Sequence, residues 1–171
     1  GIDGVEALWL NHTVATDSAI GIPTGVRWYE IRNPNGVPVL NQAGTLQPDA
    51  LYRWMGSLAV DKDGNMALGY SVSSAGMYPA IRYTGRLGSD PLNILQTEST
   101  LIQGTGSQSG GYSRWGDYSA MTVDPVDDCT FWYVNEYYAT TGHDWQTRIG
   151  SFRFPQCGTI PHYTNTFLPL L

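Results

Sequence analysis

Hydrophobic and polar residues alternate along most of this chain with the two-residue period of β-strands, and almost nowhere with the period of an α-helix. Runs rich in Val, Ile, Tyr and Trp are bounded by Gly, Pro, Asn and Asp, which is typical of strands joined by turns. The predicted strands are 6–14, 25–32, 37–42, 55–61, 66–73, 78–86, 93–103, 118–124, 130–138 and 145–154. The pattern therefore predicts an all-β protein whose only helical segment is one turn at 49–54.

Part of this pattern occurs twice, at 53–86 and again at 114–154. Three pairs of residues correspond between the copies: Trp54 with Trp115, Asp61 with Asp124, and Arg82 with Arg148. A weaker third copy at 6–32 places Arg27 at the position of Arg82 and Arg148. A repeated unit of this length cannot bury its own surface, so we expect it to stack on its neighbours.

Grouped by the repeat, the strands form three units of up to four antiparallel strands, approximately 6–48, 53–103 and 114–157. The middle unit has all four strands, and the first lacks its first strand. The third lacks its outer strand, which is provided either by the tail 159–171 or by a neighbouring chain. The glycine-rich segment 104–111 is interpreted as the linker between the second and third units.

The second strand of each unit decides between two all-β architectures. These strands, at 7–10, 66–72 and 130–134, are apolar or aromatic on both faces. A sandwich leaves alternate residues in water, whereas a sheet stacked between two similar sheets buries both of its faces. Residues 1–158 are therefore predicted to be a β-propeller segment of about three blades.

The composition excludes several classes of partner. The net charge is −6, from 9 basic and 15 acidic side chains, and there is no basic run. Such a surface repels nucleic acid and anionic membranes, so neither is expected as a partner. No apolar run approaches ~20 residues, so no insertion into a membrane is expected.

The two cysteines, Cys129 and Cys157, are predicted to form a disulfide. If 130–138 and 145–154 make a hairpin that turns near 142–143, the cysteines face each other at about 4.5–5.5 Å between Cα atoms. The alternative is two buried free thiols. A disulfide implies an oxidising compartment, so we expect a secreted or cell-surface protein, and Gly1 in place of Met fits a processed segment. Asn11-His12-Thr13 is a glycosylation sequon, which matters only in a eukaryotic host.

Residues 114–125 (RWGDYSAMTVDP), followed by 127–132 (DDCTFW), resemble blades of the sialidase-like (BNR-repeat) β-propellers of exported bacterial proteins. Residues 53–71 support this resemblance, which covers roughly 6–157 and part of a larger propeller. The Asp-box of sialidases reads Ser/Thr-x-Asp-x-Gly-x-Thr-Trp/Phe. Here Thr122-Val-Asp124 precedes Thr130-Phe131 at a longer spacing, and 59–64 lacks the leading hydroxyl. Many proteins of this group have no assigned activity.

The resemblance invites a comparison of Arg27, Arg82 and Arg148 with the arginine triad that grips the substrate carboxylate in sialidases. A residue repeated in each unit is, alternatively, a structural element that pairs with a neighbouring blade, and this interpretation is favoured. The Arg-Ile-Pro type motif near the first triad arginine is absent. Glu136 with Tyr137 or Tyr138 corresponds in type to the family's glutamate base and tyrosine nucleophile, but tyrosines are also common where a strand enters a turn.

The Arg-Trp pairs at the start of two units are the candidate ligand-binding residues. A planar indole beside a guanidinium suits stacking on a sugar or holding an acidic ligand, and the alternative is packing at the blade's end. The candidates are Arg53, Trp54, Arg114 and Trp115, together with Asp117. Asp117 with Asp124, Asp127 and Asp128 also suggests calcium, although side chains that cap turns explain the same residues.

Other chemistry has no local support. The histidines, at 12, 143 and 162, are isolated, and no zinc-ligand spacing or hydrolase elbow occurs. We therefore predict no catalytic residue, no metal site and no cofactor, apart from calcium as an option. The expected function is a non-catalytic module for binding or assembly at the cell surface, and the alternative is a fragment of a sialidase-like glycoside hydrolase. The expected partners are further copies of the chain, a cleaved remainder of the same propeller, or a glycan.

Overall fold

The computed structural model describes residues 4–16, 23–111 and 114–158. This part of the chain is all-β, as predicted, and contains ten strands. They are β1 (Ala7–Ala15), β2 (Thr24–Arg32), β3 (Val39–Leu46), β4 (Tyr52–Val60), β5 (Met66–Ser74), β6 (Met77–Arg86), β7 (Ser99–Ile102), β8 (Ala120–Val123), β9 (Phe131–Tyr137) and β10 (Gln146–Phe152). The helical turn expected at 49–54 is not found, and the described residues include no helix able to cross a membrane.

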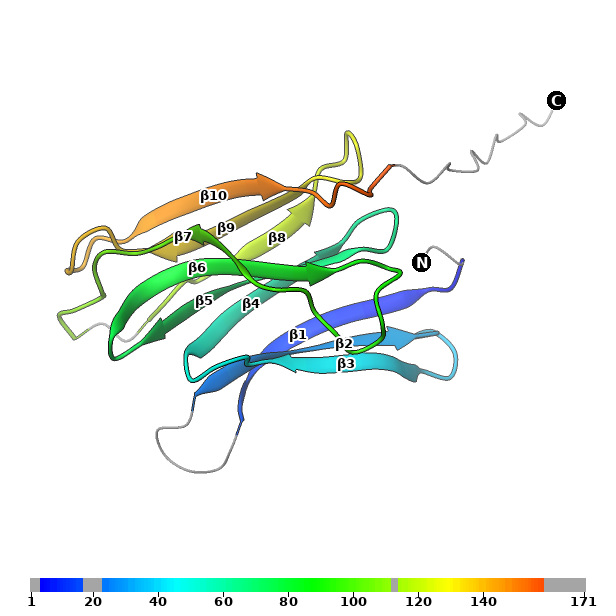
Figure 1. The fold of residues 1–171 in the computed structure, drawn as a ribbon, viewed down its shortest axis with the longest axis horizontal. Helices are drawn as coiled ribbons and strands as arrows, with labels where there is room; N and C mark the ends of the chain where they lie inside the picture. Colours follow the sequence, from blue (N-terminus) through cyan, green and yellow to red (C-terminus); the bar gives the residue numbers. More distant parts are fainter. Residues whose placement is uncertain (1–3, 17–22, 112–113, 159–171) are drawn as a thin grey trace.

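The strands form three antiparallel sheets that lie one above another (Figure 1). The strand orders are β1-β2-β3, β4-β5-β6-β7 and β10-β9-β8. The middle sheet has four strands and the outer two have three, so the expectation of one complete and two incomplete units is met in the described residues. The tail at 159–171, expected as an outer strand, lies outside the described residues.

The strand that the first sheet lacks differs from the prediction. The first strands of the three sheets lie side by side, because β4 contacts both β1 and β8. Between β4 and β8, the Ser57 hydroxyl accepts a hydrogen bond from the Met121 N–H at 2.9 Å. β1 is therefore the first strand of its sheet, and the described residues contain no fourth strand for that sheet. The sequence analysis assigned these three strands one position too late within their unit.

The middle strand β5 is buried on both faces, which confirms that the sheets are stacked. Met66, Leu68 and Tyr70 pack against Val26 and Trp28 of the first sheet. On the opposite face, Ala67 packs in a second cluster with Phe131 and Tyr133 of the third sheet. A Cβ atom at Gly69 would lie 2.4 Å from a ring carbon of Tyr133, so this close approach of the sheets depends on glycine.

The fourth strand of the middle sheet is shorter than predicted. Only Ser99–Ile102 pairs with β6, whereas a strand was expected over 93–103. Asn93 instead reaches the first sheet, where its Oδ1 accepts a hydrogen bond from the Ala43 N–H at 2.9 Å. Gln96 of the same segment bonds to β6, because its N–H donates to the Gly85 carbonyl at 2.8 Å and its carbonyl accepts from the Thr84 hydroxyl at 2.6 Å. The segment before β7 therefore links the first and middle sheets (Figure 1).

The linker 104–111 is tied to the third sheet along its length. The N–H groups of Thr105 and Gly106 donate to the Tyr138 carbonyl at 2.9 and 3.0 Å. The Ser109 N–H donates to the Gly142 carbonyl at 2.9 Å, in the loop between β9 and β10. The linker therefore connects two sheets, as predicted, and also forms part of a surface with that loop.

Cys129 and Cys157 form the predicted disulfide, with 5.7 Å between their Cα atoms. The register that led to this prediction is wrong, because Phe152 pairs with Phe131 and the cysteines are not directly opposite. The chain instead turns after β10, where the Cys157 N–H donates to the Phe154 carbonyl at 3.0 Å. That turn brings Cys157 back to Cys129. The disulfide is consistent with an extracytoplasmic protein.

Candidate functional site

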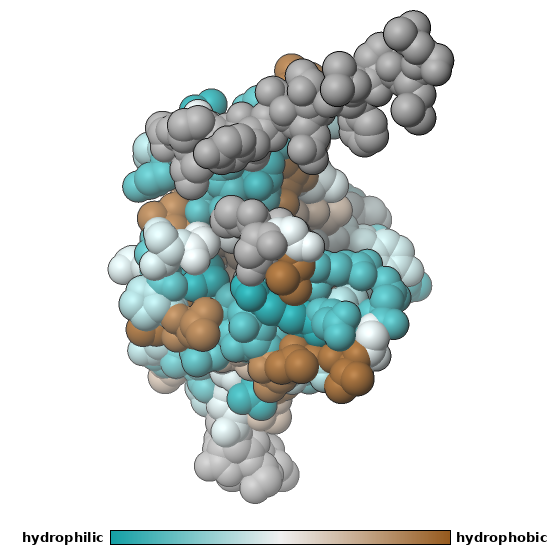
Figure 2. Space-filling model, turned by 90° about the vertical axis from the view of Figure 1, so that its right-hand side faces the viewer, coloured by the Kyte–Doolittle hydropathy of each residue, from teal (hydrophilic) through white to brown (hydrophobic). Residues whose placement is uncertain are grey.

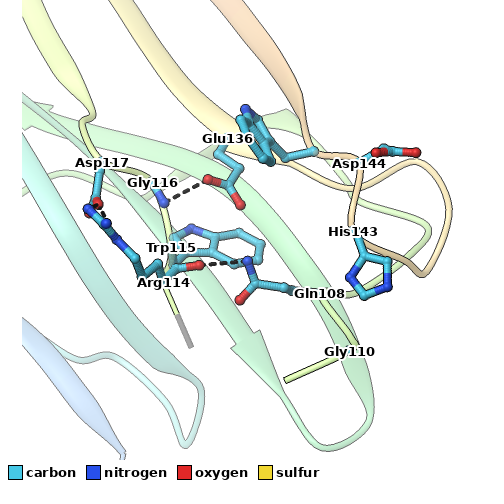
Figure 3. Close-up of a pocket in the computed structure, with 10 residues that line it drawn as sticks. Gln108, Gly110, Arg114, Trp115, Gly116, Asp117, Glu136, His143 and Asp144 are labelled. Atoms are coloured by element: carbon cyan, nitrogen blue, oxygen red, sulfur yellow. Dashed lines mark hydrogen bonds and ion pairs between the residues drawn. The ribbon is translucent and has the colours of Figure 1, made fainter. Parts of the chain in front are cut away.

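A pocket of about 910 Å³ lies at the end of the third sheet where the chain enters β8. Three stretches of chain meet there: the linker 104–111, the segment before β8, and the loop between β9 and β10 (Figure 3). The lining residues are Gln108, Gly110, Arg114, Trp115, Gly116, Asp117, Glu136, His143, Asp144 and Trp145. Three of the five predicted ligand-binding residues, Arg114, Trp115 and Asp117, are therefore brought together here.

Trp115 forms a fixed wall of the pocket. Its indole N–H donates to the Ser71 hydroxyl at 3.0 Å, which anchors the ring to the middle sheet. It also makes a T-shaped contact with Trp54 and a tilted contact with Tyr138, at centroid distances of 5.8 and 5.4 Å. Aromatic pairs of this kind are stabilising and hold the rings in one orientation. Trp54 itself does not line the pocket, but supports Trp115.

Glu136 connects β9 to the segment before β8. Its Oε2 accepts a hydrogen bond from the Gly116 N–H at 2.7 Å. Gly116 has φ +51°, in the left-handed region that glycine adopts without strain, and this conformation supports the approach. The other oxygen, Oε1, is buried and has no hydrogen-bond partner among the described residues. Figure 3 shows Glu136 pointing from the strand toward Trp115 and Gln108.

The surroundings of Glu136 shift the pKa of its carboxyl upward. Burial raises the pKa of this carboxyl above its ordinary value, and the charge of Asp117 raises it further. The Gly116 N–H and the nearby Tyr138 hydroxyl lower the pKa, but not enough to cancel burial.

The loop between β9 and β10 supplies the opposite wall. Trp145 is 62 % exposed, so its ring face is available to a ligand. His143 lies against Gly110 so closely that a Cβ atom at Gly110 would overlap the imidazole. Gln108 donates from its amide to the Arg114 carbonyl at 2.6 Å and to the Tyr138 hydroxyl at 3.1 Å.

The sequence did not single out Gln108, Asp144 or Trp145 for this site, because the pairing of the linker with the β9–β10 loop is a tertiary contact. The only local signal was the tryptophan at the edge of a turn, Trp145.

Arg53 is placed differently from its counterpart Arg114. Its side chain is completely buried and forms ion pairs with Asp49 and Glu98 at 2.7 and 2.9 Å. Glu98 also accepts a hydrogen bond from the Tyr70 hydroxyl at 2.6 Å and pairs with Arg82. Arg53 is therefore part of the framework and offers no group to a ligand. Arg114 is exposed and forms an ion pair with Asp117, with Nε at 2.8 Å from Oδ2.

The three repeated arginines do not converge on one cavity. Arg82 pairs with Glu98 between β6 and β7, whereas Arg148 is exposed on β10. Arg27 donates to the Thr45 hydroxyl at 2.9 Å. It lies in β2, the second strand of its sheet, whereas Arg82 and Arg148 lie in the third strands of their sheets. Arg27 is thus not the structural counterpart of the other two.

The aspartates considered for calcium act on turns in this structure. Asp127 accepts hydrogen bonds from the N–H groups of Cys129 and Thr130 and from the Thr130 hydroxyl, which lowers its pKa to about 2. Asp124 accepts from the Val126 N–H at 2.9 Å and from the Trp132 indole at 3.0 Å. Asp128 has φ +52°, a turn conformation. Asp63 lies near the sulfur atoms of Cys129 and Cys157, but these sulfurs are bonded to each other and are not free to bind a metal.

Comparison with protein-family models, curated proteins and solved structures found no match for this chain.

Proposed function

We propose that this chain is a non-catalytic, extracytoplasmic β-propeller module that binds a neutral carbohydrate in the pocket between Trp115 and Trp145. One observation carries the proposal: the indoles of Trp115 and Trp145 line one pocket together with the polar side chains of Gln108 and Glu136. The amide and carboxyl groups can exchange hydrogen bonds with the hydroxyls of a bound molecule. A sugar offers hydroxyl donors and apolar C–H faces in one molecule, and the latter stack on tryptophan rings.

The charges of the pocket favour a neutral ligand over an acidic one. Three carboxyl groups, of Asp117, Glu136 and Asp144, line it together with one arginine, Arg114. That arginine is already paired with Asp117. An anionic sugar would meet uncompensated negative charge and no free guanidinium, which selects against it.

The same geometry weighs against the sialidase-like alternative. A sialidase of the family that the sequence resembles needs three arginines around one carboxylate. Here Arg82 is held by Glu98, and Arg27 and Arg148 lie on the two outer sheets. The Tyr138 hydroxyl lies near Glu136, but Tyr138 is completely buried and does not line the pocket, and the lining includes one arginine rather than three.

The propeller architecture rests on two features. The three antiparallel sheets are stacked with their first strands together, as blades are around a propeller axis. In addition, β5 is buried on both faces, which a two-layer sandwich would not require. The disulfide supports placement at the cell surface or in the secreted fraction.

Glycan binding tests the proposal directly. The purified chain is screened against neutral, amino-substituted and sialylated glycans, and the strongest ligand is titrated by calorimetry. We expect neutral glycans to bind and Trp145→Ala to weaken binding about 30-fold, since losing a stacking tryptophan costs roughly 2 kcal/mol. Tyr78→Ala is the matched control, because Tyr78 is 50 % exposed and lies outside the pocket.

Three outcomes would contradict the proposal: no binding to any glycan, equal binding by Trp145→Ala, or preference for sialylated ligands. A fluorogenic sialoside is included in the same series. Turnover that is lost in Arg82→Ala would establish the enzyme alternative instead.

A further inference from the structure

The stack of sheets ends in two faces that no other described part of the chain covers. The head face belongs to the first sheet, and its exposed members include Leu8 and Leu40, at 50 and 59 %. Leu10, Tyr29 and Ile31 complete it, since they alternate with Trp9 and Trp28, which point into the core. The tail face belongs to the third sheet and comprises Ala120, Trp132, Val134 and Ile149.

The middle sheet shows how a tail face is occupied inside the molecule. In its first turn the Asp61 N–H donates to the Asn65 carbonyl, and in the third sheet the Asp124 N–H donates to the Thr130 carbonyl. Ala67 lies two residues after Asn65, and Trp132 lies two residues after Thr130, so Ala67 and Trp132 are at equivalent positions in the two sheets. Ala67 is completely buried because the next sheet covers it, whereas Trp132 is 42 % exposed and Ile149 is 62 % exposed. The tail face of the third sheet is therefore equivalent to a face that receives another sheet.

The head face shows the same property at the other end. Leu8 and Leu40 of the first sheet are 50 and 59 % exposed. Figure 2 looks at the molecule from the strand ends on the right of Figure 1 and shows separate hydrophobic patches in its lower part, at the height of this sheet. Exposed apolar faces of this kind mark interaction surfaces.

The two faces are complementary in charge. The strand positions of the head face include Arg27 and His12 and no carboxylate. The strand positions of the tail face outside the pocket carry no charge; in the adjoining turn lie Asp124, which accepts the hydrogen bond of the Trp132 indole, and Asp127, which pairs with Arg153. A head face is thus suited to a tail face and poorly suited to another head face.

We propose that the head face docks on the tail face of a second copy of this chain, and that two copies close into a ring. The contact is heterologous, because different surfaces of the two copies meet, and such contacts form rings when the rotation closes. Two copies contribute six sheets, twice the three of one chain, which lies within the roughly 4–8 blades of propellers. Three copies would exceed that range.

The size of the faces agrees with a stable dimer. The head face has strands of nine, nine and eight residues and measures about 400 Å², whereas the strands of the tail face have four, seven and seven residues and give about 280 Å². A closed pair has two contacts, each between one head face and one tail face, or about 1,400 Å² in total. This is the size of a standard specific interface.

Two single substitutions and their mixture test the pairing. Native mass spectrometry and sedimentation equilibrium should show a species of twice the 18.8 kDa chain mass for the unaltered protein. Leu8→Asp on the head face and Ile149→Asp on the tail face should each weaken association about 100-fold, since each puts a charge into an apolar contact. An equimolar mixture of the two variants should regain a dimer, because one intact head still meets one intact tail.

Val126→Asp is the matched control: Val126 is a 92 % exposed apolar residue in a turn and belongs to neither face, so its dimer should be unchanged. All substituted positions are exposed, and circular dichroism confirms that each variant is folded. A monomeric unaltered protein at 100 µM overturns the proposal and leaves a further segment of a longer chain as the occupant. A dimer that only one substitution weakens, or a mixture that stays monomeric, overturns head-to-tail pairing. These measurements need no glycan, so their failure is independent of carbohydrate binding.

Discussion

Glu98 should be the carboxylate on which the stability of the middle sheet depends most. It accepts hydrogen bonds from Arg53 Nε and Nη2 at 3.1 and 2.9 Å and from the Tyr70 hydroxyl at 2.6 Å, and it also pairs with Arg82. Glu98→Gln keeps the size of the side chain but removes the charge. The completely buried Arg53 would then retain only Asp49, whose side chain is 43 % exposed.

The expected loss of stability depends on the ion pair between Arg53 and Asp49 that Glu98→Gln leaves in place. Removing one partner of a buried ion pair costs about 3–5 kcal/mol, and because Asp49 still pairs with Arg53 we expect about 3 kcal/mol for Glu98→Gln. At about 2–4 °C per kcal/mol for a chain of this size, the midpoint of thermal unfolding should fall by about 10 °C. Arg53→Met combined with Glu98→Gln should lose less than the sum of the single losses, since both substitutions remove the same contact.

The dependence on pH has a defined sign. Burial raises the pKa of Glu98, but the hydrogen bonds from Arg53 and Tyr70 outweigh burial, and the net pKa lies below the ordinary value. Its stabilising contribution is therefore complete above the unfolded pKa of about 4.3 and is lost as pH falls through the lower folded value. The difference between the unaltered protein and Glu98→Gln should shrink correspondingly below about pH 4.

The assay is denaturant and thermal unfolding followed by circular dichroism between pH 3 and 8. Glu6→Gln is the control, because Glu6 is exposed and its carboxylate accepts hydrogen bonds from Asn35 at the surface, so its substitution should cost at most about 0.5 kcal/mol. A loss below 1 kcal/mol for Glu98→Gln at pH 7 would refute the reasoning. A loss that stays constant down to pH 3 would refute it as well.

Two further predictions concern the framework. Replacing Cys129 and Cys157 by serine should cost about 3.5 kcal/mol, from the loop-closure entropy for a sequence separation of 28, and alkylation before and after reduction, read by intact mass, checks the bridge. Two thiols alkylated without reduction would show that the bridge is absent. Gly69→Ala should cost about 2–3 kcal/mol, since its Cβ would lie 2.4 Å from the Tyr133 ring, whereas Gly76→Ala meets nothing within 4 Å and should be nearly neutral in chemical denaturation. Equal stability of the two glycine variants would mean that the sheets do not approach each other at Gly69.

The strands could be predicted because their signal is local. Alternation of apolar and polar residues, with Gly, Asn and Asp between the runs, marks a strand wherever the chain later packs. For the same reason the double-sided burial of β5 was visible in the sequence, since Met66–Ser74 has no polar face that would suit water. The repeat of Trp54 as Trp115 likewise predicted two neighbouring positions, and their rings are in contact.

Which strand pairs with which neighbour was less accessible. A shift of one strand leaves the alternation in 6–46 intact, so the sequence pattern could not show that β1 is a first strand. The disulfide was predicted from a register that is three residues out, and the bond forms because the turn after β10 brings Cys157 back. The sequence likewise did not show that Asn93, before β7, bonds through its side chain to β3.

One part of the candidate site could be predicted from the sequence, and the other part could not. The sequence by itself determined that Arg114, Trp115 and Asp117 lie together, because they are adjacent in the chain. Only the tertiary structure decided that Arg53 is buried while Arg114 is exposed. Asp49 and Glu98, four and 45 residues away from Arg53 in the chain, both pair with Arg53, and neither pairs with Arg114. The tertiary structure also brought Gln108 and Trp145 to the pocket through hydrogen bonds between the linker and the β9–β10 loop. Side-chain type and strand periodicity are properties of short segments, whereas burial and the pairing of charges depend on which distant segments fold against them.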